Sequence, residues 1–190
     1  MAGRPREFEP EEALASAKGV FWRLGYEGAS MHEIEKATGL KKQSLYRAFK
    51  DKRGLYLAAL DHYARNEIRT ALDILTGEGT AHERVKALFD LIVEDAASGR
   101  RLGCFVCSAS EDQAMLDEAS REAVARQTER LLYGLFVALS VSEPYVSDEK
   151  RRLSKANELL ALHFGLRVMS RGGAPVELIR QAADAAVSAI

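Results

Sequence analysis

Apolar residues recur every three or four positions along almost the whole chain, which is the spacing of one face of an α-helix. In the first such segment the apolar positions are Leu14, Ala17, Val20, Phe21 and Leu24. Pro10, followed by Glu11 and Glu12, is a favourable start for this helix, because proline fits the first turn and acids face the positive end of the dipole. We expect the helix to end at Gly25.

Two short helices are predicted next, joined by a tight turn. Ser30 and Glu33 have the spacing of a capping box, with Ser30 as the N-cap and Glu33 at the third helical position. Gly39 ends the helix that they open. A second short helix is expected over about 42–49, with Leu45 and Phe49 on its inner face.

The rest of the chain also follows the helical period. Asp51 is a plausible N-cap for a long fourth helix that ends at 76–80. No segment alternates with the period of two that strands require. Further helical segments are expected over 82–97, about 102–116, 120–139, 149–171 and 176–190. The prediction is an all-α chain of about nine helices, with an N-terminal three-helix domain at 1–56 and a larger helical domain at 57–190.

The short helices have the layout of a helix-turn-helix, in which one helix braces a second that enters the major groove of DNA. Residues 33–38 form the brace, and 42–49 form the reading helix. Lys42, Gln43 and Ser44 stand at its N-terminal end, where Gln pairs well with adenine and Lys with guanine. Tyr46, Arg47 and Lys52 are suited to phosphates, which fix the register of the protein on the duplex.

The charge distribution agrees with a nucleic-acid face on one end of the chain. The 190 residues carry a net charge of −1, yet residues 1–60 hold 11 Lys and Arg against 8 Asp and Glu. Within 36–53 there are seven basic residues and one acid, Asp51. A local basic patch on a near-neutral chain favours binding of nucleic acid, although a solvated charged face has the same composition.

These residues together resemble the TetR family of bacterial transcriptional regulators. The resemblance is dense over 11–60 and rests on Phe21, Gly25, Tyr26, Ser30, Ile34, Gly39, Ser44, Leu45, Tyr46, Phe49, Lys52 and Leu55. It implies a ligand-responsive repressor that binds a pseudo-palindromic double-stranded operator as a homodimer. By position, His32 matches a family site that sometimes contacts bases. Lys41 stands where the family often has a small polar N-cap, and its side chain is a further candidate for phosphate.

In such proteins the last two helices form the dimer interface. Their apolar positions here include Leu159, Leu160, Phe164, Ile179, Ala183 and Ala186. Two helices of this kind from each subunit would form a four-helix interface around a two-fold axis. The same stripes would also suit the core of a single subunit.

The resemblance also implies a pocket for a small-molecule effector among the middle helices. Candidate lining residues are Phe89, Ile92, Cys104, Phe105, Met115, Tyr133, Phe136 and His163. Each of them also suits an ordinary core, because pockets and cores share this composition.

Two cysteines offer another way to sense a signal. Cys104 and Cys107 are three residues apart and follow Arg100 and Arg101. Nearby arginines and the start of a helix both lower a thiol pKa, so a thiol-based redox response is one alternative. The other is simple packing, since an isolated pair of this spacing is weak evidence for redox chemistry or zinc.

Other function classes have less support. The chain has no metal-ligand or nucleotide-binding motif, so no metal, cofactor or catalytic residue is predicted. A cofactor-free helical enzyme that uses His163 with Cys104 or Glu111 remains an alternative, as does a DNA binder with little sequence preference. No run of about 18 apolar residues is present, and the first seven residues have no apolar region, so we expect a cytoplasmic protein without a membrane partner.

Overall fold

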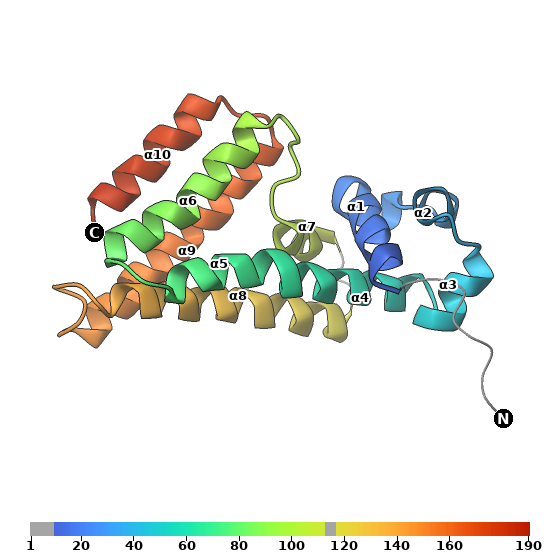
Figure 1. The fold of residues 1–190 in the computed structure, drawn as a ribbon, viewed down its shortest axis with the longest axis horizontal. Helices are drawn as coiled ribbons and strands as arrows, with labels where there is room; N and C mark the ends of the chain where they lie inside the picture. Colours follow the sequence, from blue (N-terminus) through green and yellow to red (C-terminus); the bar gives the residue numbers. More distant parts are fainter. Residues whose placement is uncertain (1–9, 113–116) are drawn as a thin grey trace.

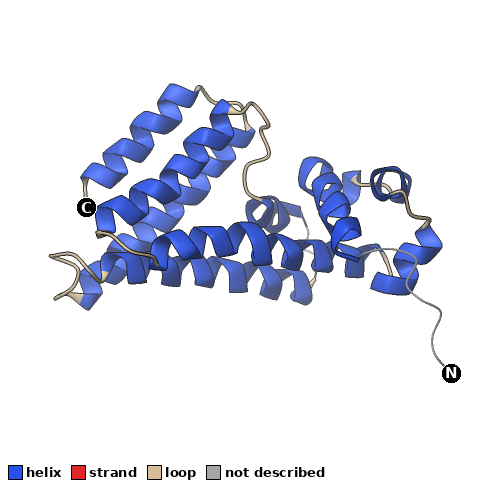
Figure 2. Ribbon diagram, in the orientation of Figure 1, coloured by secondary structure: helices blue, strands red, loops and turns tan. Residues whose placement is uncertain are grey.

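The computed structural model describes residues 10–112 and 117–190, and every regular element within these ranges is a helix (Figure 2). The elements are α1 (Pro10–Gly28), α2 (Met31–Thr38), α3 (Lys42–Phe49), α4 (Lys52–Tyr63), the π-helix η1 (Ala64–Ile68), α5 (Arg69–Thr76), α6 (Ala81–Ala97), α7 (Phe105–Asp112), α8 (Glu118–Leu139), α9 (Glu149–Arg171) and α10 (Val176–Ser188). Because α4, η1 and α5 follow one another without a break, the described residues form nine helical rods, which confirms the predicted fold class.

The first three helices and the start of α4 form a small unit, called here the N-terminal unit, at one end of the long axis (Figure 1). Phe21, Ile34, Leu45 and Tyr56 are fully buried and come from its four helices. The Phe21 and Tyr56 rings pack edge to face, with their centroids 5.1 Å apart. Each of these short helices is therefore held by at least one anchor residue.

The helical backbone of α1 breaks at Gly25. Its backbone has φ 71° and ψ 177°, a conformation outside the helical region, and one more turn then runs to Gly28. The helix that begins at Pro10 therefore ends at Gly25, as predicted, and a separate short turn follows it. A positive φ is accessible to glycine at little cost, since glycine has no Cβ.

The fourth predicted helix extends from Lys52 to Thr76, as expected, but contains a wider π-turn at Ala64–Ile68. Asp51 caps its start and accepts a 2.7 Å hydrogen bond from the Gly54 amide. Single π-turns within α-helices occur frequently at functional sites. The predicted domain boundary between residues 56 and 57 lies inside α4, so one rigid helix passes through it.

The remaining helices, called here the C-terminal unit, pack along the rod, and α7 lies between α1 and α8 (Figure 1). α5 and α8 lie side by side, while α6, α9 and α10 form a second group beside them (Figure 1). Gly134 permits the close approach of α8 to α5, because a Cβ there would lie 2.9 Å from both Leu72 and Leu75 side chains. None of the helices at 10–112 or 117–190 has the length and apolar character needed to cross a membrane.

Candidate nucleic-acid interface

The brace helix α2 begins and ends with the predicted chemistry. Ser30 Oγ accepts a hydrogen bond from the Glu33 amide at 3.2 Å, and Glu33 Oε2 accepts one from the Ser30 amide at 3.0 Å. These bonds lower the pKa of the Glu33 carboxyl, with the backbone bond as the largest cause. Gly39 adopts the left-handed conformation with φ 71°, and its amide donates to the Glu35 carbonyl. The turn between the two helices is thus fixed at both sides.

The start of the reading helix α3 is capped in a way that the sequence did not reveal. Lys41 occupies the N-cap position and makes no capping bond with its side chain. Glu35 on α2 supplies the missing acceptor, because its Oε1 receives the Lys42 amide at 2.6 Å. The carboxylate of the brace helix therefore holds the first turn of the helix it supports.

The outer face of α3 is polar and its inner face is anchored. Leu45 is fully buried. Lys42, Gln43 and Arg47 are exposed, and Ser44 and Tyr46 are half-buried beside them. The ammonium of Lys42 lies 5.1 Å from the centre of the Tyr46 ring, a cation–π distance. Five of the predicted DNA-binding residues are therefore brought together on one short helix.

Two further predicted residues flank α3 on the side of the turn. His32 is exposed at the start of α2, and Lys41 is exposed at the start of α3. Both line a shallow groove of about 290 Å³ that also includes Lys36 and Gly39. Glu35 and Leu40 complete the lining. The two exposed lysines of this groove are in keeping with a surface that approaches phosphates.

The last predicted residue, Lys52, stands at the first position of α4. Its ammonium lies 4.4 Å from the centre of the Tyr26 ring, which directs it beside the end of α1. Gly54 in the same turn is required by packing, because a Cβ there would lie 2.0 Å from the Phe49 carbonyl oxygen. The start of α4, where Lys52 stands, therefore packs against α3.

Within 10–112 and 117–190, the predicted effector-pocket residues have different surroundings. Phe89, Ile92 and Phe105 are fully buried, and Cys104 and His163 nearly so. Tyr133 is 66% exposed and lines an outer groove of about 390 Å³ with Leu72 and Arg130. Phe136 is half-buried, with the Arg152 guanidinium 4.2 Å from its ring centre. Met115 lies outside the described residues.

A smaller groove of about 200 Å³ lies where α7, α8 and α9 meet. Its lining residues are Val106, Cys107, Ser110, Glu111, Val124, Thr128, Phe164 and Val168. The walls are mostly apolar, with one thiol and one carboxylate at the edge. This composition suits a small organic molecule more than a metal or nucleotide.

Cys104 occupies a polar niche directly before α7. The Tyr63 hydroxyl donates to its Sγ at 3.6 Å. Hydrogen bonds from the Cys107 side chain and backbone, with help from Tyr63, lower the pKa of the Cys104 thiol despite its burial. The pKa of Cys107 is raised, first by its hydrogen bond to Cys104 and then by burial. Both cysteines are free thiols. Because the pKa of Cys104 is lowered and that of Cys107 is raised, Cys104 is the more acidic of the two.

His163 and Glu111, the residues of the enzyme alternative, have different surroundings. His163 is 4% exposed and lies 6.2 Å from Phe89 between ring centres. Burial, and then the charge of Arg167, lower its pKa to about 3. Glu111 is exposed.

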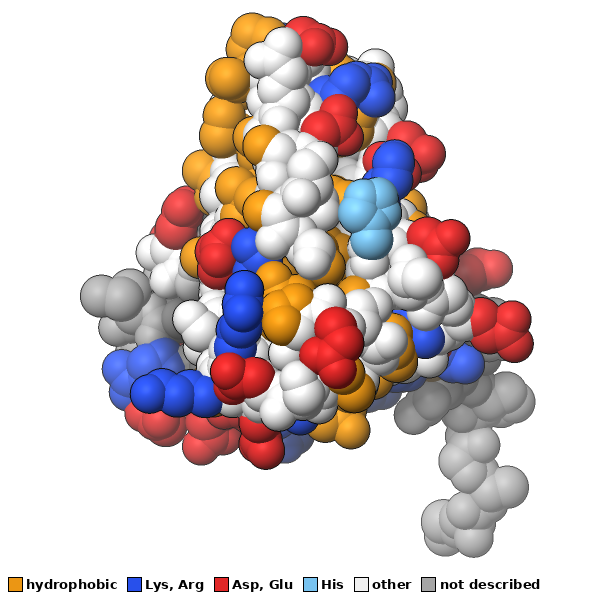
Figure 3. All heavy atoms as spheres, turned by 90° about the vertical axis from the view of Figure 1, so that its left-hand side faces the viewer, with side chains coloured by type: hydrophobic (Ala, Val, Ile, Leu, Met, Phe, Trp, Pro, Cys, Tyr) orange, Lys and Arg blue, Asp and Glu red, His pale blue; other side chains and the backbone are white. Residues whose placement is uncertain are grey.

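The residues predicted for the dimer interface are already largely buried within one subunit. Leu159 and Ile179 are fully buried, Ala183 is 3% exposed, and Leu160 and Ala186 are each 8% exposed. Phe164 is half-buried. The large apolar side chains that α9 and α10 expose are Leu153, Val168 and Leu178. Figure 3 shows hydrophobic side chains along one edge of the upper half of the molecule, seen from the end at which α10 lies.

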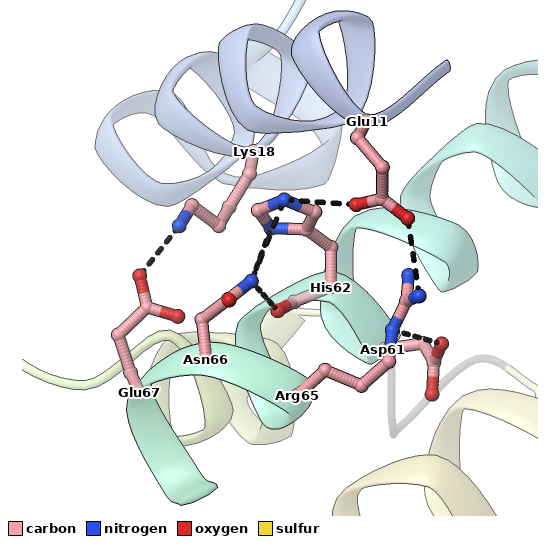
Figure 4. A network of polar contacts seen from close by, with 7 residues as sticks. All are labelled: Glu11, Lys18, Asp61, His62, Arg65, Asn66 and Glu67. Carbon is pink, nitrogen blue, oxygen red and sulfur yellow. Dashed lines mark hydrogen bonds and ion pairs between the residues drawn. The ribbon is translucent and has the colours of Figure 1, made fainter. Parts of the chain in front are cut away.

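Polar contacts that the sequence pattern does not indicate attach α1 to the long rod (Figure 4). Lys18 pairs with Glu67 at 2.5 Å, and Glu11 contacts both His62 at 3.4 Å and Arg65 at 3.1 Å. Burial is the main reason that the pKa of His62 is lowered. These pairs join residues about fifty positions apart, so no local pattern reports them.

Comparison with known proteins agrees with this geometry. A model of the family "Bacterial regulatory proteins, tetR family" matches residues 13–59, which extend from α1 into α4. The repressor BdcR of Escherichia coli K12 is 34% identical over 107 residues, or 56% of this chain and 54% of BdcR. The repressor ComR of the same strain is 44% identical over 61 residues, or 32% and 29% of the two chains. The matches span about half or less of these relatives.

Solved structures match over nearly the full length. A cysteine mutant of the TetR family regulator CifR, in complex with 26 bp double-strand operator DNA, has a TM-score of 0.80 and 28% identity, and the match covers 98% of this chain and 99% of CifR. The reduced form of E. coli NemR has a TM-score of 0.78 and 20% identity, with 93% of each chain covered. The fold is therefore shared over both units.

Proposed function

Because the chain belongs to the TetR family of bacterial regulatory proteins, we propose that it is a sequence-specific DNA-binding repressor released from its operator by a small molecule. The observation that carries this proposal is the reading helix α3. It is anchored by Leu45, capped by Glu35 and polar on its outer face. A rigid helix with a polar outer face is what major-groove recognition requires.

The side chains of α3 and its flanks divide into two roles. Lys42 and Gln43, which are exposed at the first two positions of the helix, contact bases. Ser44 and His32 lie beside them. The phosphate contacts come from a wider ring of residues, namely Lys41, Tyr46, Arg47 and Lys52. Phosphate contacts supply most of the salt-dependent affinity, while base contacts supply the preference among sequences.

The active species is a homodimer. Two copies of α3 would lie about 34–36 Å apart to enter successive major grooves of a pseudo-palindrome. The exposed apolar residues Leu153, Val168 and Leu178 on α9 and α10 support an interface on that side of the C-terminal unit. Leu159, Leu160, Phe164, Ile179, Ala183 and Ala186 lie behind or beside this surface and shape it.

The effector occupies the groove between α7, α8 and α9, which Cys107, Phe164 and Val168 line. Its apolar walls favour an organic molecule with a largely apolar body. An effector acts only through a difference in affinity between the DNA-competent and DNA-free states, typically about 1–3 kcal/mol.

Selection of DNA by the purified full chain tests this function. We expect enrichment of one pseudo-palindromic sequence from a random pool, and sequence-specific retention of that duplex in a mobility shift assay. Recovery of DNA with no preferred sequence would indicate a non-specific binder. Failure to retain any DNA at low salt would refute the proposal.

A second candidate function, a response to oxidants, is favoured by the niche of Cys104. Its thiol precedes α7, accepts hydrogen bonds from Tyr63 and Cys107, and has a lowered pKa, which favours the reactive thiolate. With hydrogen peroxide, the thiolate attacks one oxygen and hydroxide leaves, which gives a sulfenic acid. The Cys107 thiol then attacks that sulfur, and a disulfide and water result.

Treatment of the protein with an oxidant distinguishes this function from the first. If it holds, peroxide releases the protein from DNA, dithiothreitol restores binding, and Cys104→Ser binds DNA but ignores the oxidant. Unmodified thiols by mass spectrometry, together with unchanged DNA affinity after peroxide, would leave the groove as the site of sensing.

A further inference from the structure

The side chain of Arg171, at the last position of α9, reaches the end of α1. Its Nη1 donates to the Trp22 carbonyl at 2.8 Å and to the Leu102 carbonyl at 3.0 Å, and Nη2 donates to the Arg23 carbonyl at 3.4 Å. Trp22 and Arg171 are 149 residues apart in sequence. One guanidinium therefore joins the N-terminal unit, the segment between α6 and α7, and the C-terminal end of α9.

The contacted carbonyls belong to a helix end that needs donors. α1 is interrupted at Gly25, where the backbone leaves the helical region. Carbonyls in the last turn before such a break lack the full set of intrahelical partners, and they form the negative end of the helix dipole. Trp22 and Arg23 lie in that turn, so a guanidinium is well matched to this position in both charge and hydrogen bonding.

The backbone at Gly103 passes very close to α9 beside Arg171 and so fixes the position of this residue. Gly103 has φ +67°, and a Cβ added there would lie 2.8 Å from the Arg167 carbonyl oxygen and 3.0 Å from the Arg171 Cβ. Only glycine allows the segment that carries the Leu102 carbonyl to pass so near α9. The same segment continues directly into Cys104 and α7.

Arg171 thus stands where the proposed sensing and dimer surfaces meet the DNA-binding end. Val168, one turn earlier on α9, lines the groove between α7, α8 and α9. Trp22 itself packs into the C-terminal unit, with its ring 6.2 Å from Phe105 and 5.0 Å from Tyr63 between centroids. A shift of α9 or of the segment before α7 therefore reaches α1 through these contacts.

We propose that Arg171 is the positioning residue through which the C-terminal unit sets the orientation of the DNA-binding unit. This inference rests on the proposed function, because the orientation matters only if α3 contacts DNA. In this proposal Arg171 acts without touching DNA. It holds α1 at a fixed place on α9, and an effector that moves α9 or residues 98–104 would release that hold.

The test compares Arg171→Gln with the full-length wild type by hydrogen exchange and DNA binding. Arg69→Gln is the matched control, because Arg69 is 74% exposed on α5 and pairs only at 3.7 Å with Asp73. In the free protein, we expect exchange in residues 19–29 and 99–104 to become about tenfold faster in Arg171→Gln. The rest of the chain, and the control variant, should exchange at wild-type rates.

On DNA enriched by selection, Arg171→Gln should bind more weakly by a factor within the range of about 5–150 typical of coupled sites. The slope of affinity against salt should stay at the wild-type value, because no phosphate contact is removed. Arg171→Lys keeps the charge with fewer donors, so an intermediate loss is expected.

Three results would overturn the inference. One is unchanged exchange in residues 19–29, and a second is faster exchange spread evenly over the whole chain, which indicates general destabilisation. The third is normal DNA affinity in both Arg171 variants. If the wild type itself enriches no DNA, the proposed function fails, while the exchange data still decide whether Arg171 holds α1.

Discussion

At the scale of single residues, the surface of α3 separates residues that read sequence from residues that bind the backbone of DNA. Gln43 is exposed at the second position of α3, whereas Lys52 is half-buried and fixed beside the Tyr26 ring. A side chain that reaches base edges changes sequence preference, and one that reaches phosphates changes affinity for all sequences. The two kinds of residue therefore differ in what their loss does.

Gln43→Ala should lose preference at one or two base pairs, at a cost of about 1–3 kcal/mol on the best sequence. Lys52→Ala should instead weaken binding to every duplex and lower the salt slope by about one unit. Competition assays across sequences and salt concentrations measure both effects. A change of preferred sequence in Lys52→Ala would contradict this division of roles.

The buried His163 predicts a pH dependence of stability. Its folded-state pKa is lowered to about 3 from an ordinary value of 6.5, because of burial and the nearby Arg167. Between these values the unfolded chain binds a proton that the folded chain does not, so stability is full above pH 6.5 and falls as the pH is lowered toward 3. The slope from this group is at most roughly 1.4 kcal/mol per pH unit.

His163→Leu should remove that part of the acid sensitivity. Urea unfolding from pH 7 to 4 is the measurement, and the difference between variant and wild type isolates the histidine from the carboxylates. His82→Leu is a control, because His82 is exposed at the start of α6. Parallel pH curves for wild type and His163→Leu would show that His163 does not contribute.

At the scale of elements, local chemistry predicted helix ends well and distant contacts poorly. The Ser30 and Glu33 cap, the Gly39 turn and the limits of α9 follow from neighbouring residues, and the structure has them as predicted. The π-turn in the long rod was missed, because no local residue pattern marks it. Glu35 was missed for the same reason, since its partner is on the next helix.

Because Glu35 caps α3, a new cap at Lys41 should compensate for the loss of Glu35. Glu35→Ala should weaken DNA binding, because the first turn of α3 loses its acceptor, a change worth about 0.5–2 kcal/mol for helix caps. Adding Lys41→Ser supplies an acceptor at the N-cap itself and should restore the stability of α3. Thermal unfolding and DNA affinity of the single and double variants measure the effect.

The salt slope serves as the internal check, because Lys41→Ser also removes one candidate phosphate contact. We expect the double variant to regain stability while its slope falls by about one unit. If Glu35→Ala had wild-type stability and wild-type affinity, the 2.6 Å bond to the Lys42 amide would have no role in holding the reading helix.

At the scale of the whole molecule, the sequence predicted the all-helical fold class, but it did not distinguish subunit core from subunit surface. Leu159 and Ile179 have the helical spacing of an interface, yet both are fully buried inside one protomer. Val168 and Leu178 have the same apolar character and are nearly half exposed. Periodicity identifies an apolar stripe, and only the packed structure tells which part of it remains uncovered.

This distinction decides how the proposed dimer is tested. Leu159→Glu or Ile179→Glu would bury a charge in the protomer core. Loss of the dimer in these variants could therefore not be distinguished from unfolding. Val168→Glu and Leu178→Glu place the charge on the exposed faces of α9 and α10, where the folded protomer tolerates it. Both variants should keep helical circular dichroism and sediment as monomers.

The same variants should lose tight binding to the pseudo-palindrome and keep weak binding to a single half-site, because each monomer still carries an intact α3. Val141→Glu is the control, since Val141 is 49% exposed in the segment after α8 and lies outside α9 and α10. Its sedimentation and its affinity for both duplexes should match the wild type. A stable dimer in both Val168→Glu and Leu178→Glu would move the interface away from this face, and the spacing of the two reading helices would then have to come from another contact.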